Sequence, residues 1–314
     1  MGGKELNIEA SEQPQFMGYA QSANTLFNFM ELSDYLKQTL TRKAFIPRYY
    51  VENVKFLNLD FNGDRFDEVE VLQTCFCDIP LSKLFKEESV KCVGETFEKL
   101  SPKDKEKALS KNTHPDFYGR YAIALSKDWG SKKGLQPIHY INDGSQISKS
   151  IKKAFSDLMS LDSLPNEVVD DFLNRFAYMK PVRGEMEKYF MDENSAKRTL
   201  VYEKVFHDEQ EWRYVPDRDI MDSYGIEYLH ANPQAIEERE TWNEKIRTDY
   251  YKGLWLDFEY SDIRYLIVPD NEGRNELIHV ISNLPAALFG VEEDLEKKIL
   301  ISKIIVLENI KEDM

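Results

Sequence analysis

The first patterned stretch of the chain predicts a strand followed by a helix. Residues 1–23 are polar and are expected to form a loose N-terminal arm. Residues 25–29 read as a short strand, and the apolar positions between 32 and 40 then recur at helical spacing. Pro47 cannot continue that helix, because its ring removes the N–H that the helix needs. We therefore place the first core elements between residues 24 and 47.

A β-hairpin is predicted next, with strands at 54–61 and 65–77. Asn62-Gly63 stands between them, and both residues tolerate positive φ, as a tight hairpin turn requires. The triplet Asp60-x-Asn62-x-Asp64 also resembles the start of a calcium loop. The sixth and twelfth positions hold neither the Gly nor the Glu of that loop, so the hairpin is favoured and no metal site is expected.

Further strands separated by helical stretches follow. The apolar runs predict strands at 121–125, 137–141, 200–206, 211–215, 263–268 and 299–307. Helical insertions are expected at about 83–113, 146–182 and 216–252. Strands at both ends with helices inserted between them indicate the α+β class. We expect a mixed, mainly antiparallel sheet in a single domain over residues 24–314, with the 83–113 insertion outside its core.

Charge and cysteine content narrow the protein class. The 314 residues include 41 Lys+Arg and 56 Asp+Glu, a net charge of −15, which disfavours duplex nucleic acid as a partner. No apolar stretch approaches the ~20 residues of a membrane span, and the polar N-terminus is not expected to be a signal peptide. The cysteines at 75, 77 and 92 fit a reduced, cytoplasmic protein. Cys75 and Cys77 are expected as unligated thiols on a buried strand, because their spacing does not suit zinc.

The common catalytic signatures are absent. The sequence contains no P-loop, no Gly-rich dinucleotide fingerprint after a strand, no G-x-S-x-G elbow and no H-E-x-x-H. His114 precedes Pro115 and is expected in a loop near the surface. These absences disfavour nucleotide hydrolysis, Rossmann-type redox chemistry, α/β-hydrolase chemistry and zinc proteolysis.

The most informative segment is Glu209-Gln-Glu211-Trp212-Arg213 at the start of a predicted strand. Period two puts Glu209 and Glu211 on one side of the backbone. ADP-ribosyl transfer uses such a pair: one carboxylate stabilises the oxocarbenium-like state and the other orients or deprotonates the acceptor. The other interpretation is structural, with Trp212 in the core and Arg213 paired to a carboxylate. Both interpretations stay open.

Four segments together resemble a known family. They are Phe27-Asn28-Phe29 with Phe45-Ile-Pro47-Arg48-Tyr49, Cys75-Phe-Cys-Asp-Ile-Pro-Leu-Ser82, His114-x-x-x-Tyr118-Gly119-x-Tyr121, and Glu209-x-Glu211-Trp212-Arg213. The octapeptide at 75–82 is the most specific. From about residue 24 to its end the chain resembles the AbiGi family of bacterial abortive-infection (phage-resistance) proteins. That resemblance implies the antitoxin of a two-gene pair whose toxin resembles a nucleotidyltransferase.

The layout also resembles a divergent ADP-ribosyltransferase of the DarT-like type. This resemblance implies NAD as a substrate and a nucleic acid or protein as acceptor. Glu211 and Glu209 would be catalytic, Arg48 would hold the pyrophosphate, and Tyr118 or Tyr121 would stack on nicotinamide. Asn28 stands where relatives often carry His, so this sequence departs from the pattern there.

Three hypotheses result: an NAD-dependent effector of phage defence, a non-catalytic antitoxin or regulator, and an inactive transferase fold that senses a nucleotide. A DNA-binding antitoxin requires a helix-turn-helix. The candidate helices are 147–161 and 165–180, and the second is acidic. That acidity disfavours DNA reading and tips the sequence interpretation toward the enzyme, with a cognate toxin or antitoxin protein as the expected partner.

Overall fold

The structure is a computed structural model that describes residues 23–312, except 62, 63, 111, 162–167, 169, 170, 173, 227, 228, 231 and 232. Residues 1–22 of the predicted arm therefore lie outside the described residues, and so does the Asn62-Gly63 turn. Within the described ranges, the helices are too short or too polar to cross a membrane.

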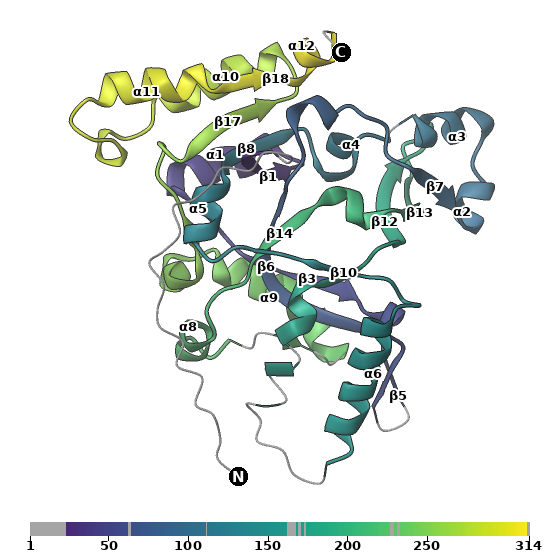
Figure 1. Ribbon diagram of the computed structural model, residues 1–314. Helices are drawn as coiled ribbons and strands as arrows, with labels where there is room; N and C mark the ends of the chain where they lie inside the picture. The colour runs from purple at the N-terminus through teal and green to yellow at the C-terminus, as the bar shows by residue number, and fades with distance from the viewer. Residues whose placement is uncertain are drawn as a thin grey trace.

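One large mixed sheet organises the described chain (Figure 1). Its main path runs β18 (Ile304–Val306), β17 (Ile263–Val268), β8 (Tyr121–Ser126), β1 (Thr25–Met30), β6 (Glu68–Cys77), β14 (Glu211–Tyr214) and β9 (Gln136–Pro137). Two further strands pair with β6: β3 (Arg48–Asn53) and β15 (Leu229–His230). Every pairing in this sheet is antiparallel except β17 with β18. The predicted α+β class with a mainly antiparallel sheet is confirmed.

Strand β1 lies at the centre of the sheet and is apolar on both faces. Leu26 packs into one buried cluster with Leu36 and Leu40 of α1 (Ser33–Arg42). Phe27, on the opposite face, packs into a second cluster with Cys77. A strand whose two faces are both covered reads as a continuous apolar run, which is why Leu26-Phe27 marks it in the sequence.

The C-terminal segment corrects one prediction. Residues 299–307 were expected to form a strand, but α11 (Glu293–Ser302) takes the first half and only β18 is extended. Leu300 is buried in the same cluster as Leu277 and Ile281 of α10 (Asn271–Ser282). Packing between the two helices outweighs the strand propensity of the isoleucine-rich sequence. Figure 1 shows α10 and α11 stacked beside β17 and β18.

A second, three-stranded sheet corrects the 83–113 prediction. Helices α2 (Glu95–Glu98) and α3 (Pro102–Leu109) form there, but the segment also contributes β7 (Val90–Val93). That strand pairs with β13 (Lys197–Lys204), which pairs in turn with β12 (Gly184–Met191). Cys92 and Ala108 belong to a buried cluster with Leu200, so the segment contributes to a core and is not a surface appendage.

Strand β3 was missed in the sequence. Of the predicted strand 54–61, only β4 (Leu59–Phe61) is extended, paired with β5 (Asp64–Phe66), whereas β3 pairs along β6 over six residues. Pro47 precedes β3, so it removes no donor from the ladder and does not exclude the strand.

The remaining elements agree with the prediction in part. Residues 216–252 are mainly helical, whereas 146–182 contains α6, a 3-10 helix and a strand. The bounds are β2 (Ala44–Phe45), α4 (His114–Tyr118), α5 (Lys127–Lys132), β10 (His139–Ile141), α6 (Gln146–Met159), η3 (Arg175–Tyr178), β11 (Met179–Pro181), η4 (Phe206–Glu209), α8 (Arg218–Ser223), α9 (Pro233–Ile246), η5 (Asp249–Leu254), β16 (Leu256–Asp257) and α12 (Leu307–Glu312).

Gly119 provides a test of this fold. Its φ of 111° is a conformation that residues with a Cβ rarely adopt, and a Cβ there would lie 2.1 Å from the Met30 carbonyl oxygen. Gly119→Ala is expected to lower the free energy of unfolding by about 3–5 kcal/mol, from backbone strain and overpacking together. Gly134→Ala is the matched control, because that glycine also has positive φ but open space around it. Urea titration of both variants makes the comparison, and equal losses would contradict the proposed contact.

Candidate functional site

The predicted Glu-x-Glu segment leads into β14, which lies between β6 and the short edge strand β9 in the large sheet. Glu209 ends the short 3-10 helix η4, and Glu211 opens the strand. Period two sends Glu211 and Arg213 to one face, while Trp212 packs into the main core on the other. Glu209, Glu211 and Arg213 are all buried, and Arg213 has no exposed surface. The carboxylates are therefore interior groups.

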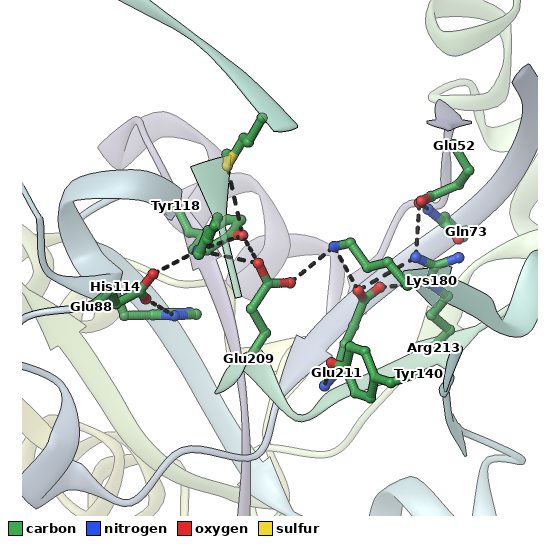
Figure 2. A network of polar contacts seen from close by, with 12 residues as sticks. Glu52, Gln73, Glu88, His114, Tyr118, Tyr140, Lys180, Glu209, Glu211 and Arg213 are labelled. Atoms are coloured by element: carbon green, nitrogen blue, oxygen red, sulfur yellow. Dashed lines mark hydrogen bonds and ion pairs between the residues drawn. The ribbon is translucent and has the colours of Figure 1, made fainter. Parts of the chain in front are cut away.

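Arg213 is the most deeply buried member of a network of charged side chains (Figure 2). Its Nε donates to Glu211 Oε1 at 2.5 Å, and its Nη2 lies 2.8 Å from Glu52 Oε1 on β3. Its Nη1 donates to the Ala177 carbonyl at 2.7 Å. Gln73 on β6 donates to the same Glu52 oxygen at 2.7 Å. The guanidinium thus joins β14, β3 and the segment before β11.

Lys180 on β11 connects the two glutamates. Its Nζ lies 2.9 Å from Glu209 Oε2 and 3.1 Å from Glu211 Oε2. The Tyr140 hydroxyl accepts from the backbone N–H of Glu211 at 2.8 Å. A single ammonium between two carboxylates neutralises the repulsion that would otherwise raise the pKa of one of them.

Lys204 on β13 extends the network to the small sheet. Its Nζ lies 3.1 Å from Glu209 Oε1 and 2.8 Å from Glu88 Oε2, and it donates to the Tyr118 hydroxyl at 2.9 Å. The Tyr118 hydroxyl in turn donates to Glu209. His114 Nδ1 lies 3.1 Å from Glu88 Oε1. The network therefore crosses from the large sheet to β13 and α4.

Electrostatics keeps these carboxylates ionised despite their burial. Burial opposes ionisation of Glu211, but the charges of Arg213 and Lys180 and the hydrogen bond from Arg213 together outweigh it and hold the pKa of that carboxyl far below its usual range. For Glu209, burial is likewise outweighed by Lys180 and Lys204, and its pKa is lowered. Burial lowers the pKa of His114, so this imidazole is neutral at pH 7. The expectation of a surface loop at His114 was wrong, because α4 buries it between Phe29 and Tyr118.

The other predicted site residues are Asn28, Arg48 and Tyr121, and each has contacts of its own. Asn28 on β1 donates to the Cys75 carbonyl at 2.8 Å, and Cys75 is the ladder partner of Arg213. Arg48 on β3 is half-buried and its Nη2 lies 3.7 Å from Glu240 Oε2 on α9. Tyr121 on β8 lines a surface pocket of about 500 Å³ with Glu31, Pro115, Asp116, Gly119, Arg120 and Pro269.

The structure thus brings Tyr118, Glu209 and Glu211 together. No hydrogen bond or ion pair between described residues joins Arg48 or Tyr121 to them. The roles assigned to these residues in NAD binding and catalysis stay predictions. Cys75 and Cys77 lie on β6 as expected, and burial raises the pKa of both thiols.

Sequence reasoning missed several members of the network: Glu52, Glu88, Lys180 and Lys204. One signal was present for Lys204. Leu200, Tyr202 and Lys204 alternate along β13 and all three are buried. A lysine in phase with buried apolar residues indicates an internal cation that needs a carboxylate partner.

Glu211→Gln is expected to lower the free energy of unfolding by about 3–5 kcal/mol, because Arg213 loses its closest counter-charge while remaining buried. Glu238→Gln removes an exposed carboxylate on α9 and should stay within about 0.5 kcal/mol of wild type. Urea titration at pH 7 makes the comparison. A Glu211→Gln protein that unfolds with the wild type would show that the carboxylate is dispensable for stability.

His114 predicts a pH dependence. The unfolded chain protonates this imidazole near pH 6.5, whereas the folded chain does so only at lower pH. The unfolded state therefore binds more protons below about pH 6.5, and stability falls as pH drops through that value, by at most about 1.4 kcal/mol per pH unit. His114→Gln should flatten this slope between pH 7 and pH 5 in urea titrations. His139→Gln, at an exposed histidine, should retain it; identical slopes for all three proteins would refute the assignment.

Comparison with known proteins supplies the family. Residues 107–269 match the family model described as "Putative abortive phage resistance protein AbiGi, antitoxin". The chain is 33% identical over 283 residues to the abortive phage resistance protein AbiGi of Lactococcus lactis subsp. cremoris, which covers 86% of this chain and 99% of that relative. No solved structure matches. The family resemblance seen in the sequence is confirmed, and the chain belongs to the AbiGi family of abortive phage resistance proteins.

Proposed function

We propose that this chain is the non-catalytic antitoxin of an abortive-infection pair and that it acts by binding a toxin protein. The observation that carries the proposal is the saturation of Glu209 and Glu211 by internal cations. Lys180, Lys204 and Arg213 contact these two carboxylates at 2.5–3.1 Å. A carboxylate that must meet a developing oxocarbenium needs an open position, and its own cations compete for that role.

The family description supports the same proposal, because it names an antitoxin. This reverses the preference drawn from the sequence, in which the NAD-dependent transferase came first. The surface pocket of about 500 Å³ is lined by neither Glu209 nor Glu211. The transferase therefore remains the competing hypothesis that an experiment should separate from the antitoxin.

Protein binding is a better mechanism than operator binding. A net charge of −15 opposes association with duplex DNA. In the basic helix α6, Lys153 forms an ion pair with Asp157, so part of its positive charge is compensated within the helix. The second candidate helix, 165–180, falls in part outside the described residues; residues 168, 171, 172 and 174 are helical, and the segment ends in the 3-10 helix η3 and the strand β11. Its first part carries Glu167, Asp170 and Asp171, which disfavour contact with phosphates.

Co-expression in bacteria tests the function. The protein encoded beside this chain is induced alone and then together with the chain, and growth and cellular NAD are followed. We expect the partner alone to arrest growth, the chain to restore it, and NAD to be unchanged by the chain. Growth arrest with NAD loss caused by the chain alone, abolished in a folded Glu211→Gln variant, would instead establish the transferase.

A further inference from the structure

The small sheet has an outer face that the described chain leaves uncovered. Side chains on β12 alternate, so Glu185, Glu187, Tyr189 and Met191 point outward and are exposed. Glu203 points outward from the neighbouring strand β13 and is also exposed. We call these five residues the β12 face. Figure 1 shows β12, β13 and β7 together at the side of the molecule remote from α11.

Strand β12 also has a free edge. It pairs with β13 over eight residues on one side, and no strand among the described residues pairs with its other side. Among the described residues, alternate N–H and C=O groups along that edge therefore have no backbone partner, although Lys107 Nζ donates to the Met191 carbonyl. Such an edge is a template for an added strand, and peptide recognition commonly uses it.

Three carboxylates lie close together on the β12 face. Glu185 stands directly across from Glu203, a like-charge cross-strand pair that disfavours the sheet. Glu187 follows two residues along the same face. Within the described ranges none of the three forms an ion pair, although Lys91 on β7 stands opposite Glu203. An arrangement that costs stability and gathers negative charge beside a free edge suits a cationic occupant.

The far end of the face is apolar. Tyr189 is 68% exposed and Met191 is 49% exposed. Lys197 of β13 lies 3.5 Å from the centre of the Tyr189 ring, which orients that ring over the sheet. Exposed aromatic and methionine side chains are typical anchors of protein interfaces. The face thus offers backbone hydrogen bonds, a negative row and an apolar anchor along one strand.

We propose that β12 binds an extended lysine- or arginine-rich segment of the partner protein by strand addition, with Glu185, Glu187 and Glu203 pairing its basic side chains. A second copy of this chain is disfavoured as the occupant, because both copies carry a net charge of −15 and repel each other. The inference rests on the proposed antitoxin function and names the surface through which it works.

Two charge-reversed variants test the surface. Glu185→Lys/Glu187→Lys inverts the row at exposed positions, so its melting temperature should match or exceed that of the wild type. Glu292→Lys/Asp294→Lys makes the same change of net charge at exposed positions by α11 and is the matched control. We expect the first variant to bind the neighbouring-gene protein about 100-fold more weakly, and the control to bind as the wild type does.

Hydrogen exchange supplies a direct readout. In the complex with that protein, alternate β12 amides should exchange at least about tenfold more slowly than in the free chain, because added-strand carbonyls accept from them. Rescue of growth by both variants, or unchanged β12 exchange in the complex, would overturn the proposed surface while leaving the antitoxin function intact.

If the chain fails to restore growth, the antitoxin function is overturned. A peptide then tests the β12 surface independently of that function. The probe is a capped octapeptide in which lysine alternates with valine or threonine, measured by calorimetry against the same peptide carrying glutamate for lysine. Binding of the lysine peptide that the Glu185→Lys/Glu187→Lys variant loses and the control retains would sustain the surface. Absent binding, or equal binding by both variants, would overturn it.

Discussion

The full burial of Arg213 is the constraint on which the surrounding structure depends. A guanidinium cannot be deprotonated in a protein, so a site with no exposed surface must supply carboxylates and carbonyls to every side of it. Glu211, Glu52 and the Ala177 carbonyl meet that need from β14, β3 and the segment before β11. Further cations are then needed, because Lys180 bridges Glu211 to Glu209, and Glu209 is neutralised by both Lys180 and Lys204.

This network fixes the arrangement of its segments more than it adds net stability. Burying charges costs desolvation energy that their attraction only offsets, and an apolar replacement of similar shape is often as stable. Losing one member, however, leaves its partner charged in a medium of low dielectric constant. The small sheet is held to the large one through Lys204, Glu209 and Glu88, so a displaced β13 would leave a buried ammonium unpaired. We infer that the charges specify how the two sheets dock.

The sequence predicted what depends on local pattern and failed where distant groups decide. Residues 263–268 were placed without error, because a β-branched run bounded by turn residues carries its own signal. The structural interpretation of 209–213 placed Trp212 in the core and paired Arg213 with a carboxylate, and the structure shows both, with Glu211 as the carboxylate. The burial of Glu209 and its pairing with Lys180 could not be predicted, since Lys180 stands 29 residues away along the chain, whereas the alternation along β13 did signal an internal cation at Lys204. Burial of a charge is decided by tertiary partners that no local window contains.

Strand β13 contributes one residue to the buried charge network and one residue to the β12 face. Its alternation sends Lys204 inward to the buried network and Glu203 outward to the β12 face. In the network, four carboxylates face three cations, Lys180, Lys204 and Arg213, so most of the net charge of −15 belongs to the rest of the molecule. A partner that adds a strand to β12 would bind only the folded hairpin of β12 and β13. By mass action it would then stabilise the strand that places Lys204, and through Lys204 the docking of the two sheets.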